Sequence, residues 1–235
     1  MRLEPRREAI LKCIVDEYIR HAEPVGSKLV ADQYGQASSA TIRNDMASLE
    51  DAGYIVQPHT SAGRVPTEKA YVYYLQHFVE PQRGEADEKR VREGMGLGGC
   101  REVGQEDEVR ALARTLMELS GEMALVAVDP RRSVYAGVAN LFEKPEFGDL
   151  MVVRELSRLL DRFDEVMGEV FERVESEPQV LIGSENPFGK DMSAIMVKCR
   201  LPSGQIGILG LIGPMRMDYD RNIGIVENVR DILDE

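Results

Sequence analysis

A helix with one apolar face and one small, polar face, followed by a glycine-containing hairpin pattern, constrains the fold of this chain more than any other stretch. Counted from Ile42, apolar residues recur at Met46 and Leu49, which is the spacing of a buried helix face. The opposite face of the same helix consists of Ala40, Arg43, Asn44 and Ala47. The pattern predicts that one face packs inward while the other can enter a groove.

The residue types on the outward face suit the edges of DNA bases. Arginine can form two hydrogen bonds with guanine and asparagine two with adenine, so Arg43 and Asn44 are the candidates for base contacts. Ala40 and the methyl group of Thr41 leave room for a close approach. A face that is merely solvated usually carries more Glu and Lys. Helix capping or phosphate contacts are expected for Ser38, Ser39 and Thr41.

The residues after this helix predict a two-stranded wing. Gly53 is expected to end the helix, and residues 54–57 can pair antiparallel with residues 64–67 across a loop that holds Pro58. Arg64 is expected to reach the DNA backbone or a narrow minor groove, as arginines commonly do. Further DNA contacts from the wing are expected from His59, Thr60 and Ser61.

Three further helices complete a predicted winged-helix DNA-binding domain over residues 1–80. Residues 6–20 carry a broad apolar stripe. A short helix is expected to end at Gly35 and to begin at Ser27, which either caps it or, with Lys28, contacts phosphate. Both roles of Ser27 are compatible with the sequence. From about Thr67, a last helix is expected to place in the core Tyr71, Tyr74, Leu75 and Phe78.

Residues 81–120 are predicted to form a charged, glycine-interrupted linker followed by a helix. Residues 94–99 formally satisfy the G-x-G-x-x-G pattern of dinucleotide loops, but a charged segment rather than a strand precedes them. We therefore expect a flexible break there and no cofactor. The helix that follows is predicted from the apolar repeat of Val109, Leu112, Ala113, Leu116 and Leu119.

Residues 121–235 alternate strand and helix patterns, so the whole chain is expected to be α+β. Strands are predicted over residues 123–128 and 134–139, and a helix over 153–174. Residues 192–201 and 205–212 flank a Pro-Ser-Gly turn and predict an antiparallel hairpin with one buried face, covered by a helix over 222–233. Either a ligand cleft or, as we favour, a structural corner is compatible with Pro214, Arg216, Asp218 and Tyr219.

The charge distribution limits the kind of partner. The net charge of −12 argues against a protein that coats nucleic acid indiscriminately, since nonspecific affinity comes mainly from Lys and Arg. Through Glu80 the chain has 9 Lys and Arg against 11 Asp and Glu, and downstream it has 20 against 30. The acidity therefore lies mostly outside the candidate DNA-binding part.

Membrane, metal and catalytic functions find little support in the sequence. No apolar run approaches the roughly 20 residues that cross a bilayer, and the first residues are charged, so a cytoplasmic protein without membrane contact is expected. The cysteines at positions 13, 100 and 199 indicate neither a disulfide framework nor a zinc site, and Cys13 and Cys199 are expected in cores. Neither a nucleophile nor a metal-ligand set lies near His21, His59 or His77, so no enzyme activity is expected.

Motifs at both ends of the chain match one known family. The first block consists of residues 24–28, 38–46 and 57–67, and the second of residues 185–187 and 207–219. Between them lie Asn140-Leu141-Phe142 and Pro145-Glu146-Phe147. On these residues the chain resembles the HrcA heat-inducible transcription repressors of bacteria.

The resemblance implies a winged-helix domain joined to a GAF-like domain, here over residues 121–235. It also implies a homodimer that binds an inverted-repeat operator in double-stranded DNA upstream of chaperone genes, and that depends on the GroEL chaperonin. In that family the repressor is active while chaperonin is free to fold it, and unfolded proteins that occupy the chaperonin after heat shock relieve repression. Such a protein would be cytoplasmic, and associated with the bacterial nucleoid when bound.

Three features depart from the family pattern. Family members are longer, and the part missing here, between Pro130 and Ser133, carries further strands and an inserted dimerisation domain, so the GAF-like domain is expected to be abbreviated. Residues 94–99 interrupt a segment that is usually one helix, and Met215 stands where the family signature has Thr. The alternative interpretation is a winged-helix protein-interaction module without specific DNA binding, which the acidic balance motivates.

Overall fold

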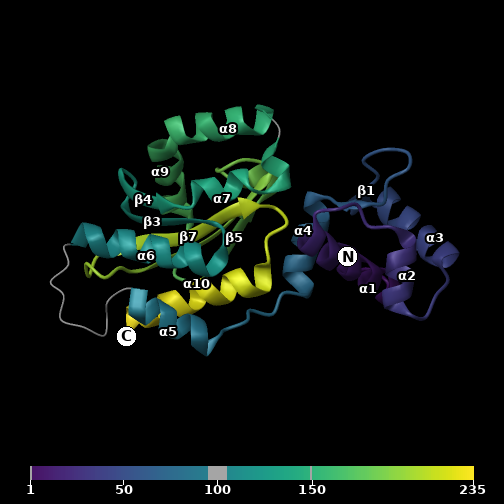
Figure 1. The fold of residues 1–235 in the computed structure, drawn as a ribbon, viewed down its shortest axis with the longest axis horizontal. Helices are drawn as coiled ribbons and strands as arrows, with labels where there is room; N and C mark the ends of the chain where they lie inside the picture. The colour runs from purple at the N-terminus through teal and green to yellow at the C-terminus, as the bar shows by residue number, and fades with distance from the viewer. Residues whose placement is uncertain (1, 95–104, 149) are drawn as a thin grey trace. The chain divides into compact units, whose positions relative to one another are not determined.

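The chain divides into two units, Met1–Val79 and Glu80–Glu235 (Figure 1). The structure is a computed structural model that describes residues 2–94, 105–148 and 150–235. Most of the glycine-rich stretch expected to be a flexible break lies outside the described residues.

The first unit contains four helices in its described part and a short hairpin. The order is α1 (Pro5–His21), α2 (Ser27–Tyr34), α3 (Ser39–Asp51), β1 (Ile55–Val56), β2 (Val65–Pro66) and α4 (Glu68–His77). The strands pair antiparallel, with Ile55 opposite Pro66 and Val56 opposite Val65. Apolar side chains of α1, α2 and α3 meet in a buried core of Ile10, Leu11, Ile14, Val30, Ile42 and Leu49. The predicted helices and the wing are confirmed.

Serine hydroxyls organise the starts of α2 and α3 differently. Of the two serines expected to cap α3, Ser38 does so, because its hydroxyl accepts a hydrogen bond from the Thr41 amide at 3.2 Å, and Ser39 is the first residue of the helix. The predicted capping of α2 by Ser27 is wrong. Gly26 occupies the cap position in an extended conformation, and its carbonyl accepts from Val30 N at 3.3 Å. Ser27 is the first residue of the helix, and its hydroxyl instead lies 3.1 Å from that of Ser39.

The buried side of α4 differs in part from the predicted one. Tyr71 and Tyr74 are buried as expected, but Leu75 and Phe78 are only half-buried. Tyr73 is buried in their place, because the residues that precede α1 cover it. Its hydroxyl accepts from Leu3 N at 3.2 Å and donates to Glu8 at 3.0 Å. The helical repeat alone could not reveal this long-range contact.

The second unit is built on an antiparallel sheet. Five strands of its described part lie in the order β4-β3-β7-β6-β5. They are β3 (Met123–Asp129), β4 (Arg132–Ala136), β5 (Gln179–Ile182), β6 (Met192–Arg200) and β7 (Ile206–Pro214). The helical segments are α5 (Glu85–Gly94), α6 (Gln105–Ser120), α7 (Val138–Phe142), η1 (Pro145–Gly148), α8 (Leu150–Asp161), α9 (Phe163–Arg173), η2 (Gly183–Glu185) and α10 (Tyr219–Asp234).

Helices cover both faces of this sheet (Figure 1). On one face, Ala194 and Met196 of β6 join a core with Leu156 of α8 and Val170 of α9. On the other face, α10 packs against β6 and β7, and α6 packs against β3. The prediction of a hairpin with a single buried face is therefore wrong. Alternation along β6 was misleading because Met196 is apolar and Lys198 buries its stem while its ammonium group donates to Phe171 O at 2.9 Å.

A strand end, a helix and an additional strand in this unit also differ from the predictions. The second strand ends at Ala136 and is followed by α7, because Gly137 adopts φ +83 and turns the chain. The single helix expected over residues 153–174 is two helices that meet at Arg162. The apolar stripe continues across this break from Leu159 to Phe163, so periodicity gives no sign of it. The edge strand β5 was not predicted.

The β3–β4 connection is a tight turn at the edge of the sheet. Asp129 of β3 lies opposite Arg132 of β4 in the register of the two strands. The Asp129 carboxylate accepts hydrogen bonds from the amides of Arg131 and Arg132, both at 2.9 Å. Hydrogen bonding to Arg132 is the main cause that lowers the pKa of Asp129. A single carboxylate thus closes the turn.

The residues that precede α5 are held against α10. Gln82 N donates to Asp220 O at 2.8 Å, and Arg83 is ion-paired with Glu227 at 2.8 Å. Gly224 makes this close approach possible. A Cβ atom at that position would lie 1.9 Å from the carbonyl oxygen of Gln82.

The strand end after β7 is a structural corner, as favoured from the sequence. Asp218 caps α10 by accepting from Arg221 N at 3.2 Å. The buried Tyr219 hydroxyl donates to the carbonyl oxygen of Met215, and Arg216 is ion-paired with Glu146. These side chains hold the chain as it passes from the sheet into the last helix.

Candidate nucleic-acid interface

The two faces of α3 are divided as the sequence predicted. Ile42, Met46 and Leu49 are buried, with exposed fractions of 4% or less. The exposed residues of the opposite face are Ala40, Arg43, Asn44 and Ala47. The helix therefore presents to solvent a surface of small side chains around one guanidinium and one carboxamide, which are the groups that read guanine and adenine edges.

A buried carboxylate on the inner side of α3 is ion-paired with a half-exposed arginine of α1. Asp45 accepts two hydrogen bonds from Arg6 of α1, from Nε at 2.9 Å and from Nη2 at 3.0 Å. Arg7 Nε lies 3.7 Å from the same carboxylate. The hydrogen bond to Asp45 raises the pKa of Arg6 above its ordinary value. Because a two-pronged contact restrains rotation as well as distance, it helps to set which residues of α3 face outward.

The wing has an ordered tip. Gln57, just after β1, donates from Nε2 to the carbonyl oxygens of Thr60 and Ala62, both at 3.0 Å. The amide of Ala62 donates to His59 O at 2.9 Å. His59, Thr60 and Ser61 are all exposed on this loop. The tip therefore presents an imidazole and two hydroxyls on a backbone that is held from within.

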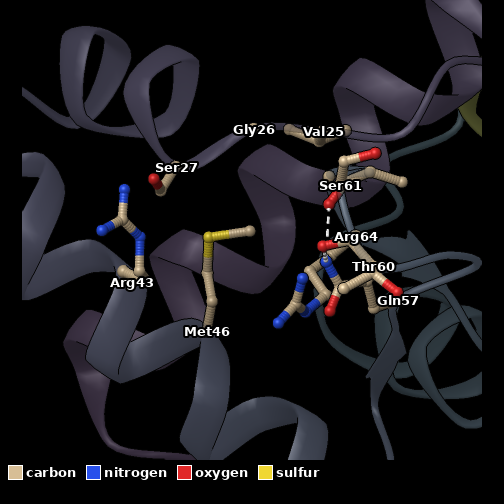
Figure 2. Close-up of a pocket in the computed structure, with 11 residues that line it drawn as sticks. Val25, Gly26, Ser27, Arg43, Met46, Gln57, Thr60, Ser61 and Arg64 are labelled. Atoms are coloured by element: carbon tan, nitrogen blue, oxygen red, sulfur yellow. Dashed lines mark hydrogen bonds between the residues drawn. The ribbon is translucent and has the colours of Figure 1, made fainter.

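A hollow of about 420 Å³ lies between α3 and the wing (Figure 2). Arg43 and Met46 of α3 and Ser27 of α2 lie on one side, and the wing residues Thr60, Ser61 and Arg64 lie on the other. Val25 and Gly26 line a third side. The hollow joins the helix and the wing into one concave surface.

Arg64 lies on this surface but already has a partner. Its Nε and Nη2 atoms lie 2.9 and 2.8 Å from Oε2 of Glu50, in the last turn of α3. The other carboxylate oxygen, Oε1, accepts from Gln57 N at 3.1 Å. The Arg64 side chain is 19% exposed and the Glu50 side chain 31% exposed.

The predicted site residues fall into three groups. Ser27, Arg43, Thr60, Ser61 and Arg64 line the hollow. Four others are exposed on the same unit without lining it, namely Lys28, Ala40, Asn44 and His59. At the start of α3, the Ser38 hydroxyl lies 3.0 Å from that of Thr41, and Ser39 contacts Ser27.

Glu50, Gln57 and Asp45 were missing from the predicted set. Gln57 lies in one of the family motifs, and that was a signal for it. A carboxylate beside a DNA-facing surface repels phosphate unless a cation offsets its charge, and this indicates that Glu50 and Asp45 need cationic partners. The sequence could not identify those partners, because Arg64 and Arg6 lie 14 and 39 residues away.

Of the cysteines, the structure describes Cys13 and Cys199, and the pKa of each thiol is raised. Cys199 is buried, and burial raises the pKa of its thiol to about 12. Cys13, expected in the core, is only half-buried and donates to Gln33 Oε1 at 2.9 Å. Burial and the nearby Glu17 raise the pKa of Cys13 to about 11. A raised pKa keeps a thiol in its less nucleophilic form at neutral pH.

The residues that the structure describes contain neither a cluster of metal-binding side chains nor a membrane-spanning helix. Among them, no group of three or more His, Cys, Asp and Glu side chains is placed to hold a metal ion. No helix in the same ranges is both long enough and apolar enough to cross a membrane.

Two family models match the chain. A model for the winged helix-turn-helix transcription repressor HrcA, DNA-binding, matches residues 2–77. A model for the HrcA protein C-terminal domain matches residues 98–223, more than half of the chain. The chain belongs to the HrcA family. The resemblance inferred from the motifs is confirmed, as is the expected combination of a winged helix with a second domain of helices and antiparallel sheet.

Relatives from several bacteria carry the same family name. A heat-inducible transcription repressor HrcA of Thermoanaerobacter pseudethanolicus is 28% identical over 322 aligned positions, which cover 95% of this chain and 94% of the relative. One from Bifidobacterium longum is 46% identical over 127 positions, 53% of this chain and 33% of the relative. The first alignment has more positions than the 235 residues of this chain, so that HrcA relative contains residues with no counterpart here.

A solved structure shares the fold. It is a crystal structure of a hypothetical protein at 2.2 Å resolution, with a TM-score of 0.77 and 21% identity. The match covers 99% of this chain and 98% of that chain.

Proposed function

We propose that this protein is a sequence-specific repressor of heat-shock genes that binds an inverted-repeat operator as a homodimer. The observation that carries the proposal is the exposed Arg43 and Asn44 pair on α3, next to a hollow bounded by an ordered wing. Membership of a family named for heat-inducible transcription repression supports it. Repression would follow from a bound protein blocking the polymerase.

Each predicted contact residue except Arg64, which is ion-paired with Glu50, has a DNA-contacting role in this proposal. Arg43 and Asn44 read base edges in the major groove, where the small Ala40 permits close approach. At the wing tip, His59, Thr60 and Ser61 contact the adjacent DNA backbone. Contacts that position the protein on phosphates, without reading sequence, are assigned to Ser27, Lys28, Ser38, Ser39 and Thr41.

The functions that we propose for the two ends of the chain are consistent with its charge distribution. Residues 1–80, nearly neutral, bind DNA, and residues 121–235, an abbreviated GAF-like domain, provide dimerisation and control of folding, with residues 81–120 between them. Two-fold symmetric protomers would contact half-sites separated by whole turns of roughly 10.5 base pairs. GroEL chaperonin is the proposed regulatory partner, and the bacterial cytoplasm, at the nucleoid when bound, is the proposed location. No cofactor, membrane contact or enzymatic step is part of the proposal.

The test is a titration of the purified protein onto a duplex with the family's inverted repeat, in parallel with a half-site duplex and a scrambled duplex. Light scattering gives the mass of each complex. We expect two protomers on the full repeat and a clear preference over scrambled DNA. Arg43→Ala should remove about 1–3 kcal/mol of this preference while the fold is preserved. Equal affinity for scrambled DNA would instead favour a winged-helix protein-interaction module.

A further inference from the structure

The carboxylate of Glu50 connects the recognition helix to both strands of the wing. Its Oε1 accepts from the amide of Gln57, at the end of the outgoing strand. Its Oε2 accepts from the guanidinium of Arg64, at the start of the returning strand. One side chain in the last turn of α3 therefore holds both ends of the wing loop.

The contacts continue from this carboxylate to the tip of the wing. The Gln57 backbone is bonded to Glu50, and the Gln57 side chain is bonded to the carbonyls of Thr60 and Ala62. A displacement of Gln57 would be transmitted directly to the loop that carries the proposed phosphate contacts. The position of the tip thus depends on the helix that reads the bases.

The wing is also tied to the segment before α2. Val25 and Arg64 exchange two backbone hydrogen bonds, at 2.8 and 2.9 Å. Gly63 allows this approach, because a Cβ there would lie 2.5 Å from the carbonyl carbon and oxygen of Val25. The backbone tie and the Glu50 carboxylate hold Arg64 from two directions.

The charges argue against Arg64 as a free DNA contact. If its guanidinium moved to a phosphate, the Glu50 carboxylate, which is 31% exposed and in contact with two residues that line the hollow, would lose its cation next to the DNA-facing surface. Like charges at such a surface are repulsive. With the pair intact, the two charges offset each other and the carboxylate does not oppose DNA binding.

We propose that Glu50, Gln57 and Arg64 form a wing clamp that places the wing against the recognition helix before DNA is bound, and that Arg64 is a positioning residue. This inference rests on the proposed DNA-binding function. A wing that is already placed loses less conformational freedom on binding, so the clamp raises affinity without touching DNA.

Glu50→Gln is the decisive variant, because the two hypotheses predict opposite signs for it. It removes the charge that holds Arg64 while keeping an oxygen for the Gln57 amide. If Arg64 contacts phosphate, losing a nearby negative charge strengthens binding. If the clamp positions the wing, Glu50→Gln weakens operator binding, by about tenfold or about 1.4 kcal/mol. Asp51→Asn removes an equal charge from the exposed next residue of α3 and measures the purely electrostatic effect.

Arg64→Met and the double variant complete the cycle. Arg64→Met removes the guanidinium and leaves an unbranched apolar side chain. We expect it to lose operator affinity to a similar extent as Glu50→Gln. The double variant should bind about as well as either single variant, since both break the same clamp. The salt dependence of binding should be unchanged by Arg64→Met, whereas a lost phosphate contact lowers the slope by about 0.9. A lowered slope, or tighter binding by Glu50→Gln equal to that of Asp51→Asn, would overturn the proposal.

Hydrogen exchange without DNA separates this inference from the proposed function. The amides of Ala62 and Arg64 are bonded to His59 O and Val25 O, not to Glu50. We expect Glu50→Gln to accelerate exchange at both amides, whereas Asp51→Asn leaves them unchanged. If the wild-type protein shows no operator preference but this exchange pattern appears, the proposed function fails and the clamp stands. Unchanged exchange in Glu50→Gln refutes the clamp whatever the DNA result.

Discussion

Replacing Gly224 by Ala tests how the residues before α5 are held against α10. The added Cβ would lie 1.9 Å from the carbonyl oxygen of Gln82 and 2.5 Å from its carbonyl carbon. Non-bonded carbon contacts are normally about 3.5–4.0 Å. The Gln82 backbone would have to move by roughly 1.5 Å, since no rotamer change can relieve a clash with the main chain. This movement breaks the hydrogen bond from Gln82 N to Asp220 O.

Opposing contributions decide the sign of the effect. In a helix interior, Ala is more favourable than Gly by about 1 kcal/mol. Overpacking costs about 1–3 kcal/mol, and the lost hydrogen bond costs about 1 kcal/mol. The steric contribution outweighs the helix propensity, which leaves a net destabilisation of about 1–3 kcal/mol. For a unit of this size, the expected fall in Tm is roughly 2–12 °C.

Scanning calorimetry of the full chain is the assay, because it can resolve separate transitions for the two units. Gly168→Ala in α9 is the matched control. A Cβ at that position would meet no heavy atom of the described residues within 4 Å. Gly168→Ala should therefore leave the Tm unchanged or raise it. A rise in Tm for Gly224→Ala equal to that of the control would contradict a steric clash with Gln82.

Two further predictions concern capping and burial. Ser38→Ala removes the cap acceptor for Thr41 N and should destabilise the first unit by about 0.5–2 kcal/mol in thermal unfolding, whereas Ser61→Ala at the exposed wing tip should change little. Because burial raises the pKa of Cys199 to about 12, above the roughly 8.5 of a free thiol, the folded state binds more protons at alkaline pH. The unfolding free energy of the second unit should therefore fall as pH rises from about 8.5 toward 12. In denaturant titrations, Cys199→Ala should show a shallower fall with pH. Equal pH dependence of the unfolding free energy in the two proteins would contradict a raised pKa for Cys199.

Local signals predicted the elements of the first unit well. The stripe of α1, the cap at Ser38 and the turn at Gly53 each depend on a few neighbouring residues, and each is found in the structure. A long-range contact accounts for the error at α4. Tyr73 is buried because the chain before α1 crosses it. The break at Arg162 has no glycine or proline to mark it.

In the candidate interface, too, the sequence predicts local features but not contacts between distant residues. The exposure of Arg43 and Asn44 follows from the period of a single helix, so the sequence was sufficient. The sequence could not predict that Arg64 is ion-paired. Its partner, Glu50, lies on a different element, and only the folded hairpin brings the two charges within 2.8 Å. Sequence patterns identify which side chains face outward, whereas ion pairs across elements depend on the tertiary fold.

The tight β3–β4 turn lies where the family resemblance implies that longer members carry an inserted domain. Asp129 and Arg132 are register partners on neighbouring antiparallel strands, so the Cα atoms of the last residue of β3 and the first residue of β4 are about 5 Å apart. A folded domain with adjacent termini could enter or leave at such a point in one genetic event, without shifting any register in the sheet. A module carried at this hairpin tip, as the family resemblance implies for longer members, would leave the register of the sheet the same in short and long chains.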